Sequence, residues 1–567
     1  MNLLTKQLEE ILSPAIEKVS PEGRDKLIIQ FTRDASLGNI QCNSAMALAK
    51  SLKQNPRKVA EEIVAAIPSS PLIESIEIAG PGFINFRLTR KGLLAYLSEI
   101  GSSDLFPGQD ENKKVIIDYS SPNIAKRMHI GHLRSTIIGD SIKRMYRYMG
   151  YSVIGDNHIG DWGTQFGKLM VAYRSWLDKE NYKTSPIEEL ERLYVKFEQV
   201  SADKPELLDE ARHELKKLQD GDETNVALWK EFIDVSLQEY DTIYSRMDIT
   251  FDTYRGESFY HSSMPGVVEE LKSKGIARES EGALVVFFDE SEHLHPCIVQ
   301  KGDGAFLYAT SDLACIQQRM KEYHVDRLVY VTDDRQIPHF NQVFRISDLL
   351  GWEVEKIHVP FGIMKFTEGN FSSRKGNVIY LAHLLDEAEK RAFEIVTEKN
   401  PSLPEEERTE IARVVGRGAV KYFDLSQNRS SNIIFDWDKV LSFEGNTSPY
   451  LQYVYARIQS IIRKSGLDEI SLPDLLPSDI SETEDKLIHT MIQFPNVIIQ
   501  AAAGYKPNLI SDYIFELSQS FNYFYNSHQI LKEAEDIKLF RLYLCRQTAV
   551  IIKTGLDLLG IQVLERM

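Results

Sequence analysis

The amino-acid sequence predicts an α/β protein built in three parts, with a parallel sheet in the middle part. At 567 residues, the chain is too long for a single hydrophobic core. From Val115 onward, short apolar runs alternate with helical stretches, which is typical of parallel strands joined by helices. From about residue 384, apolar residues recur almost entirely with helical spacing. A helical region is therefore expected after the α/β part.

Residues 1–110 are predicted to form a separate α/β module. Its first helix is amphipathic and carries Glu9, Glu10 and Glu17 among its apolar residues, unlike a signal or transit peptide, so the cytoplasm is the expected location. The expected strands and helices lie at 25–31, 73–80 and 81–88 (strands) and at 43–52 and 57–67 (helices). The polar segment 102–114 would link this module to the next part.

The middle part is predicted at residues 111–383. An apolar strand at 115–120 is followed by a helix from about Leu133 to Met149 and by a further strand near 151–160. A charged helical insertion is expected at about 165–300, after which the alternation of strands and helices resumes. A Rossmann-type sheet that is split by this insertion explains the order best.

The last part is predicted to be helical throughout. Residues 384–445 would form a helical connection, and residues 446–567 a helical domain with a surface loop at 465–485.

Composition and charge narrow the classes of function. The net charge of −17 argues against broad, nonspecific binding of nucleic acid, but it leaves room for local basic patches. Four scattered cysteines offer no zinc-binding pair and no disulfide framework, so no structural metal is expected; they are Cys42, Cys297, Cys315 and Cys545. No apolar run is long enough to span a bilayer, so no membrane partner is expected.

The segment His129-Ile130-Gly131-His132 lies between a buried strand and a helix, where α/β sheets bind nucleotides. Gly131 would let the backbone approach a planar ligand, and the two imidazoles could donate hydrogen bonds to phosphate oxygens. Lys126 adds a cation just before them. A satisfied core pair or a chance metal-like spacing is the alternative. A site that forms an adenylate explains the context better.

A second polar segment, FTEGNFSSRKGNV, contains two glycines, small hydroxyl residues and the pair Arg374-Lys375. Basic side chains in such a loop could neutralise departing pyrophosphate. Alone, the segment would be interpreted as a solvated surface turn. Together with the histidine segment, it indicates a triphosphate site.

Four stretches of the chain resemble the arginyl-tRNA synthetases, a family of class I aminoacyl-tRNA synthetases. They are VIIDYSSPNIAKRMHIGHLRSTIIGD, NHIGDWGTQFG, LYATSDLA and GLDLLGIQVLERM. The resemblance covers essentially the whole chain. It implies an arginine–tRNA ligase that forms arginyl-adenylate from L-arginine and Mg-ATP, then passes the arginyl group to the terminal adenosine of tRNA(Arg). It also implies a monomer.

The resemblance implies catalytic roles for His129 and His132, the ends of the HIGH signature of the family. The second signature of class I enzymes, KMSKS, is degenerate here, because Asn370 to Arg374 stand in its place. In this family a lysine just before HIGH is thought to substitute, and Lys126 occupies that position. Arg374 and Lys375 remain further candidates.

The resemblance also implies the substrate-binding residues. Those for arginine are Asp118, Ser121, Asn123, Tyr308, Asp312 and Gln336, and those for ATP are His129, Gly131, His132, Phe361, Gly362 and Met364. His158 and Gly160 to Trp162 would lie beside the adenylate. Plain structural readings stay open: Asp312 could be a helix N-cap, Phe361 and Met364 could be core residues, and the 158–162 segment could be a turn.

The C-terminal helical region resembles the anticodon-binding domain of the family. Tyr450 and Tyr453 would share one helical face with Arg457, and aromatic rings beside a cation suit the stacking of unpaired bases. Tyr525 and Met567 align with further positions that face the anticodon, and the N-terminal module would contact the outer corner of the tRNA. An aromatic stripe in the core is the alternative for the tyrosines.

Two other functions remain open at this point. One is a class I synthetase for another amino acid, although the chain lacks both the zinc-binding cysteines of a cysteine enzyme and a long editing insertion. The other is a noncatalytic RNA-binding relative, which would have no use for a phosphate-binding histidine segment.

Overall fold

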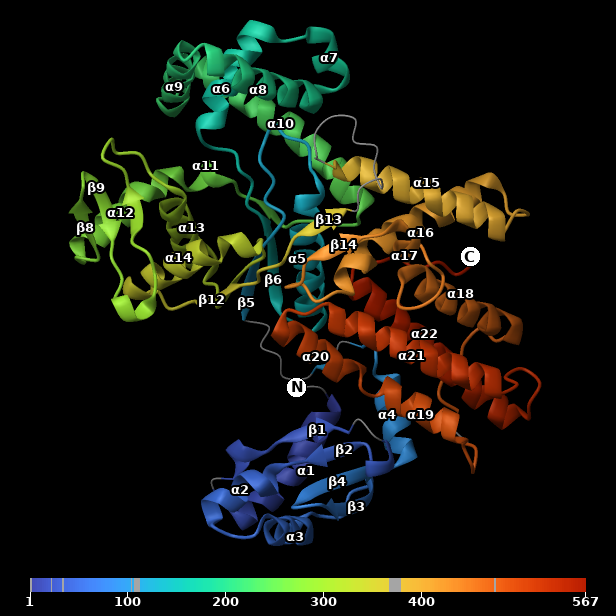
Figure 1. Cartoon of the computed structure of the whole chain (residues 1–567). Helices are drawn as coiled ribbons and strands as arrows, with labels where there is room; N and C mark the ends of the chain where they lie inside the picture. Colours follow the sequence, from blue (N-terminus) through green and yellow to red (C-terminus); the bar gives the residue numbers. More distant parts are fainter. Residues whose placement is uncertain are drawn as a thin grey trace.

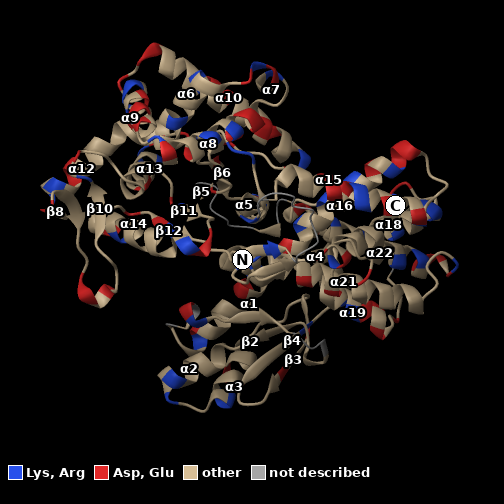
Figure 2. Ribbon diagram, turned by 45° about the horizontal axis from the view of Figure 1, so that its top comes forward, with Lys and Arg blue, Asp and Glu red and all other residues tan. Residues whose placement is uncertain are grey.

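The computed structural model describes residues 3–21, 23–32, 35–102, 105–106, 113–366, 379–473 and 476–567. It confirms the predicted fold class, because a small α/β module, a parallel sheet and a helical C-terminal region follow one another along the chain (Figure 1). Charged residues of both signs are spread along the outer helices (Figure 2). Within the described residues, no helix is both long and apolar enough to cross a membrane.

The N-terminal module is a four-stranded antiparallel sheet with helices packed on it. Its strands pair in the order β1-β2-β4-β3. The strands are β1 (Ile29–Phe31), β2 (Ile40–Cys42), β3 (Ile73–Ala79) and β4 (Phe83–Leu88); the helices are α1 (Leu3–Val19), α2 (Ser44–Leu52), α3 (Pro56–Ala66) and α4 (Arg90–Ser98). The sequence did not predict β2, because three residues are too few to show an alternating pattern.

The module is bonded to the C-terminal helical region at several points. The Tyr543 hydroxyl donates to the Leu94 carbonyl at 3.0 Å, and the Arg90 guanidinium donates to the Pro477 carbonyl at 3.0 Å. His489 Nε2 lies 3.1 Å from the Thr32 carbonyl. Segments from opposite ends of the chain therefore pack side by side (Figure 1).

The central sheet has five parallel strands in the order β12-β11-β5-β6-β7. These strands are β5 (Lys114–Asp118), β6 (Ser152–Asn157), β7 (Thr253–Tyr254), β11 (Arg327–Tyr330) and β12 (Glu355–His358), and the helices next to them are α5 (Ile130–Tyr148), α13 (Tyr308–Tyr323) and α14 (Ile337–Leu349). The strand order reverses beside β5, and α/β sheets bind ligands at such a reversal, outside the carboxyl ends of the strands.

The insertion between β6 and α13 differs in part from the prediction. Its helices are α6 (Thr164–Trp176), α7 (Lys179–Thr184), α8 (Pro186–Asp203), α9 (Glu206–Gln219), α10 (Glu223–Arg246), α11 (Glu257–Tyr260) and α12 (Met264–Ser273). Residues 277–300, expected to be helical, instead form an antiparallel sheet of β8 (Ala277–Ser280), β9 (Ala283–Val286) and β10 (Cys297–Gln300). Glu281 and Gly282 both have positive φ, as the tight turn of a β-hairpin requires.

The chain from residue 379 onward is helical apart from one short strand. The helices are α15 (Leu381–Lys399), α16 (Glu405–Leu425), α17 (Trp437–Val440), α18 (Ser448–Ser465), α19 (Glu482–Met491), α20 (Phe494–Gly504), α21 (Asn508–Ser527) and α22 (Glu535–Leu558). The strand β14 (Ile433–Phe435) pairs in parallel with β13 (Met364–Phe366), so the helical region is tied back to the sheet domain.

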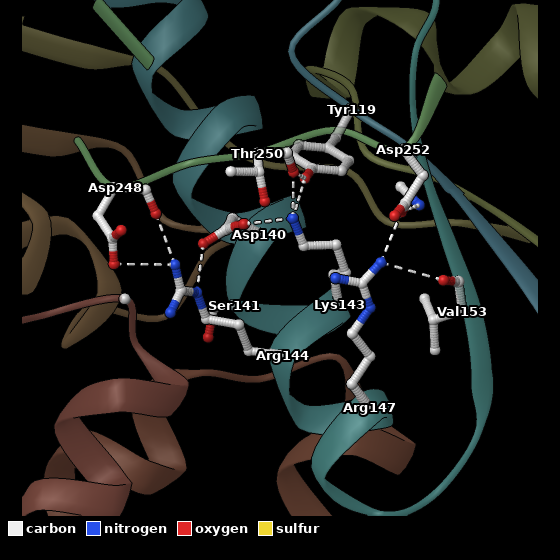
Figure 3. Close-up of polar contacts among 12 residues, drawn as sticks. Tyr119, Asp140, Ser141, Lys143, Arg144, Arg147, Val153, Asp248, Thr250 and Asp252 are labelled. Atoms are coloured by element: carbon white, nitrogen blue, oxygen red, sulfur yellow. Dashed lines mark hydrogen bonds and ion pairs between the residues drawn. The ribbon is translucent and has the colours of Figure 1, made fainter. Parts of the chain in front are cut away.

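Helix α5 is buried along most of its length, and its charged side chains are paired, Asp140 and Lys143 in the interior and Arg147 at the surface (Figure 3). Asp140 forms ion pairs with Lys143 at 2.8 Å and with Arg144 at 2.6 Å. Burial alone would raise the pKa of Asp140, but Arg144, Lys143 and Lys421 together hold it below its ordinary value. The Ser141 hydroxyl donates to the Leu558 carbonyl at 2.9 Å, so the end of α22 is anchored on the same helix.

We expect Gly139→Ala in α5 to destabilise the protein. A Cβ at this position would lie 2.3 Å from Cβ and Cγ of Tyr119, and overpacking of this kind costs about 1–3 kcal/mol. Gly266→Ala in α12 is the matched control, because its Cβ would meet nothing within 4 Å and alanine is the better helix former. Thermal melting should therefore shift down for Gly139→Ala and slightly up for Gly266→Ala. Equal melting temperatures for the two variants would contradict this packing.

Candidate active site

Helix α5 begins at Ile130, inside the histidine segment and three residues earlier than predicted. His129 is the N-cap, and its Nδ1 accepts from the Gly131 N–H at 3.0 Å. His132 Nδ1 accepts from the His129 N–H at 3.1 Å, and the two ring centroids are 4.1 Å apart. The sequence missed this start because histidine is not among the usual N-cap residues.

Both imidazoles are neutral near pH 7. Burial lowers the pKa of His129, and burial together with the charge of His129 lowers the pKa of His132 to about 3. Since each Nδ1 accepts a hydrogen bond, each ring carries its proton on Nε2. No other described residue bonds to either Nε2. Two N–H donors are therefore available at the positive end of α5, where an anion is favoured.

The loop between β5 and α5 is held in a strained conformation. Ser120, Ser121 and Ala125 all have φ between 50° and 76°, a region that non-glycine residues rarely adopt. The Ser121 N–H donates to Asn157 Oδ1 at 3.0 Å, and the Tyr240 hydroxyl lies 2.6 Å from the Asn123 carbonyl. These contacts fix the loop that carries Ser121, Asn123 and Lys126.

Asn123 also packs directly on the 158–162 segment. The backbones of Asn123 and Gly160 form an isolated parallel bridge, and a Cβ on Gly160 would lie 2.2 Å from Asn123 Oδ1. His158 Nδ1 lies 2.9 Å from the Arg255 carbonyl, and the Trp162 ring packs edge-on against Trp229. The segment is thus a packed turn beside the predicted arginine-binding loop.

Asp118 ends β5 and is buried, with both carboxylate oxygens engaged. Oδ2 accepts from Arg319 at 2.7 Å, and Oδ1 accepts from the Ser121 hydroxyl at 3.2 Å. The sequence singled out Asp118 and Ser121 but not Arg319, because a lone arginine inside a helix carries no recognisable pattern.

Tyr308 and Asp312 lie one turn apart on α13, as predicted from their spacing. Tyr308 is 72% exposed. The N-cap of α13 is Leu307, which excludes the capping role considered for Asp312. Asp312 Oδ2 lies instead 2.5 Å from His339 Nε2. Burial alone would lower the pKa of His339, but the hydrogen bond and the charge of Asp312 outweigh it and raise the pKa.

Glu257, at the start of α11, is a further acidic group of this region that the sequence did not reveal. Burial, opposed by the charge of His158 and aided by that of Asp312, raises its pKa to about 7. Its own charge acts on the Tyr308 hydroxyl. A single glutamate at the start of a four-residue helix has no distinguishing spacing, so no signal in the sequence could have found it.

The predicted adenine-binding residues lie where the chain passes from β12 to β13. Phe361 and Met364 are buried, in keeping with a packing role. The backbone N–H groups of Phe361 and Gly362 donate to the Thr332 and Arg429 carbonyls, at 3.2 and 2.9 Å, so neither is open to adenine in this structure. At Gly362 a Cβ would meet the Ser431 carbonyl oxygen at 2.7 Å, which explains the glycine.

The remaining predicted residues are Lys126, Gln336, Arg374 and Lys375. Lys126 Nζ lies 4.7 Å from the centre of the Tyr194 ring on α8, and its charge lowers the pKa of both histidines. Gln336 is exposed at the start of α14, in the loop that follows β11. Arg374 and Lys375 lie outside the described residues.

One group of side chains has the spacing of a metal site, but its chemistry is unsuitable. Ligand atoms of Asp118, His158 and Cys315 lie within 4.8 Å of one another. The Arg319 guanidinium already occupies Asp118, and burial raises the pKa of the Cys315 thiol. A metal ion here would lie beside the buried Arg319 guanidinium and would need the Cys315 thiol to lose its proton, which burial disfavours.

Comparisons with known protein families identify all three parts of the chain. Residues 99–437 match the model of the catalytic domain of class I tRNA synthetases for arginine. Residues 6–88 match the arginyl-tRNA synthetase N-terminal domain, and residues 451–567 match the DALR anticodon-binding domain. The chain belongs to the arginyl-tRNA synthetase family.

Individual relatives support the family assignment over the full length. The arginine–tRNA ligase of Fusobacterium nucleatum is 52% identical over 100% of both chains, and that of Clostridium perfringens is 43% identical over 92% of both. Among solved structures, the arginyl-tRNA synthetases of Plasmodium falciparum and Thermus thermophilus match over 100% of both chains, with TM-scores of 0.83 and 0.82 at 28% and 25% identity.

The arginyl-tRNA synthetase resemblance pointed to a group of aromatic residues in the C-terminal part, and the structure brings most of them together. The Arg457 guanidinium lies 4.8 Å from the ring centre of Tyr453 and 5.6 Å from that of Tyr525. Both rings are partly exposed, at 43% and 36%. The Tyr450 hydroxyl accepts from Asn522 at 2.8 Å. Rings that are open to solvent beside a cation argue against a purely internal aromatic stripe.

Met567, the last residue, is partly buried against the hydrophobic core. Tyr523, which the sequence did not single out, is 69% exposed on α21, the helix that carries Tyr525.

Two substitutions of His132 separate its N-capping bond from its Nε2 donor. Asparagine can place an oxygen where Nδ1 lies, and glutamine can place an N–H where Nε2 lies. If the donor binds phosphate in the transition state, we expect His132→Gln to retain more kcat than His132→Asn. Loss of such a donor costs about 10²–10³-fold. ATP–pyrophosphate exchange at saturating arginine measures this. Higher activity in His132→Asn, with equal melting temperatures, would show that capping alone matters.

Proposed function

We propose that this class I arginine–tRNA ligase forms arginyl-adenylate at the carboxyl edge of β5 and β11, then transfers the arginyl group to the 3′-terminal adenosine of tRNA(Arg). The observation that carries the proposal is the pair of neutral imidazoles at the start of α5, each with a free Nε2–H among the described residues. The loop that leads into α5 starts at the end of β5, where the carboxylate of Asp118 is buried. Hydrogen-bond donors suited to phosphate and a carboxylate suited to a cation thus lie at the two ends of one loop.

In the first step, the carboxylate of arginine attacks the α-phosphate of ATP and pyrophosphate leaves. His129 and His132 would stabilise the charge that develops on the phosphate oxygens, and Gly131 would give the nucleotide close access to the backbone. Mg²⁺ would arrive with the triphosphate of ATP. Phe361, Gly362 and Met364 would form the adenine side by packing, because the N–H groups of Phe361 and Gly362 are already bonded.

We propose that carboxylates of the protein recognise arginine through its two cationic groups, the guanidinium and the α-amino group. Asp118 and Asp312 are the predicted pair, and Glu257 adds a third acidic group next to Asp312. Planar guanidinium groups bind carboxylates through paired hydrogen bonds, which gives geometric selectivity. Ser121, Asn123, Tyr308 and Gln336 would supply the neutral hydrogen-bonding groups around them.

The two flanking parts of the chain are proposed to bind the tRNA. Tyr450, Tyr453, Tyr525 and Met567 would face the anticodon, where Arg457 already lies over two of the rings. The N-terminal module would contact the outer corner of the tRNA. The division proposed is 1–110 for this module, 111–383 for the catalytic domain, 384–445 for the connection and 446–567 for the anticodon-binding domain. We also propose a monomer that works in the cytoplasm.

ATP–pyrophosphate exchange with each amino acid in turn, with and without tRNA, tests the proposal as a whole. Exchange should depend on arginine. Exchange that depends on another amino acid would point to a different class I enzyme. An absence of exchange with tRNA present would point to a noncatalytic RNA-binding protein.

Lys126 is the proposed substitute for the lysines that the second signature lacks. We expect Lys126→Ala to slow adenylation at least tenfold, as is typical when a transition-state contact is lost. Lys196→Ala is the matched control, because Lys196 Nζ lies 5.0 Å from the Trp176 ring in the same insertion, a contact like that of Lys126 with Tyr194. Single-turnover adenylate formation measures both. Equal rates would leave Arg374 or Lys375 as the better candidate.

Glu257 should make arginine use depend on pH near neutrality. Its pKa is raised to about 7 by burial, so the carboxyl is protonated and neutral below this pH and negatively charged above it. We therefore expect kcat/KM for arginine to rise with pH through 7, up to tenfold per unit on the acid side. Glu257→Gln should lower the kcat/KM that is reached above pH 7 and make kcat/KM less dependent on pH below 7. His339 loses its proton as pH rises too, so the difference between wild type and variant is the measurement. Identical profiles would exclude Glu257 from arginine binding.

A further inference from the structure

Helix α13 carries one stripe of functional groups that runs from solvent into the interior. Tyr308, Asp312, Cys315 and Arg319 are spaced by four, three and four residues, which places them on one face of the helix. Exposure falls along the stripe from 72% at Tyr308 to 1% at Arg319. The first two members are predicted arginine-binding residues. The last is an arginine that the proposed chemistry leaves without a role.

Arg319 joins the ends of two neighbouring strands. Its Nη2 donates to Asp118 Oδ2 at 2.7 Å and to Asp156 Oδ2 at 2.5 Å. Asp118 and Asp156 are direct partners in the pairing of β5 with β6. One buried guanidinium therefore bridges two buried carboxylates at the edge of the sheet where ligands are expected.

This bridge leaves buried polar atoms of Arg319 without hydrogen bonds in the described part of the chain, which is unfavourable for stability. Nε and Nη1 of Arg319 have no hydrogen-bond partner among the described residues, although the side chain is almost fully buried. An unsatisfied buried donor destabilises the folded state, and well-packed apolar residues often replace buried ion pairs without loss of stability. Packing alone does not account for an arginine at this position.

The bridge does determine how Asp118 is presented. Arg319 holds one carboxylate oxygen and the Ser121 hydroxyl holds the other, so the carboxylate cannot rotate. Each oxygen keeps a second lone pair, and the fixed plane sets the direction in which these lone pairs point. A group that is locked before binding loses less entropy when it binds, and paired hydrogen bonds to a cation demand a fixed plane.

We infer that Arg319 is a positioning residue for arginine binding, because it fixes the Asp118 carboxylate in the orientation that accepts a cationic group of the substrate. The inference rests on the proposed role of Asp118 in arginine recognition. The effect of removing Arg319 on arginine affinity is then opposite to the one expected from charge. By charge alone, a buried guanidinium beside the site should repel arginine, so its removal would tighten binding. As a positioning residue, its removal weakens binding.

The decisive variant is Arg319→Met combined with Asp156→Asn. Wild type has two carboxylates and one guanidinium at this point, and the double variant has one carboxylate alone, so the net charge is the same. Any change in arginine binding then reflects position rather than charge. The balanced pair also avoids leaving two facing carboxylates without a cation, which could unfold the single variant.

Steady-state ATP–pyrophosphate exchange with tRNA present gives the readout. We expect the double variant to raise KM for arginine at least tenfold while KM for ATP stays within twofold of wild type. The KM of Arg319→Lys for arginine should lie between those of wild type and the double variant, because lysine keeps the charge but lacks the guanidinium plane. Arg541→Met is the matched control, since it removes a buried arginine–glutamate pair, 2.8 Å to Glu484, in the C-terminal helices. It should lower the melting temperature without changing the ratio of the two KM values.

Three outcomes would overturn the inference. A folded double variant whose KM for arginine is unchanged or lower would show that Arg319 does not position Asp118. An equal rise in both KM values would show a purely structural role. The third concerns Asp118 itself: if Asp118→Asn leaves KM for arginine unchanged, the proposed arginine site is wrong and the inference falls with it. If Asp118→Asn raises that KM and the Arg319 variants do not, only the inference fails.

Discussion

The burial of α5 is the constraint on which the rest of the structure depends. A helix that packs on almost every side needs a partner for each of its charges, because an unpaired buried charge costs several kcal/mol. Arg134 finds Asp424 on α16 at 2.9 Å and the Gly362 carbonyl at 2.5 Å. Arg144 donates to the Asp248 carbonyl after α10 at 2.5 Å and to the Asp557 carbonyl near the end of α22 at 3.3 Å. The pairing therefore gathers distant segments around the helix that begins with the histidines.

The same constraint gives the site its chemical character. Exclusion of water keeps both imidazoles neutral, so they act as N–H donors without carrying charge of their own. On the amino-acid side, each predicted carboxylate already has a basic neighbour, Arg319 for Asp118 and His339 for Asp312. The proposed site is thus organised before any substrate arrives, which suits catalysis by preset alignment and electrostatics.

The features that could be predicted from the sequence are those marked by a regular spacing of apolar residues or by a motif of several adjacent residues. The strand–helix alternation predicted the parallel sheet, and the four family-like stretches predicted the arginyl-tRNA synthetase family. Prediction failed where few residues act through tertiary contacts. Arg319 and Glu257 are single residues whose partners lie far away along the chain, and β8 to β10 are strands of four residues each. The helical start at Ile130 was missed because histidine caps it.

The hydrogen bonds between the N-terminal module and the C-terminal helical region affect how the protein would hold an RNA. The N-terminal module is bonded to the C-terminal helices through Leu94, Arg90 and Thr32, so the surfaces proposed to meet the tRNA corner and the anticodon belong to one connected body. Once one surface is engaged, the other meets the same molecule at a high effective concentration. Two weak contacts then add up to tight binding without a large basic surface, which fits a chain with a net charge of −17.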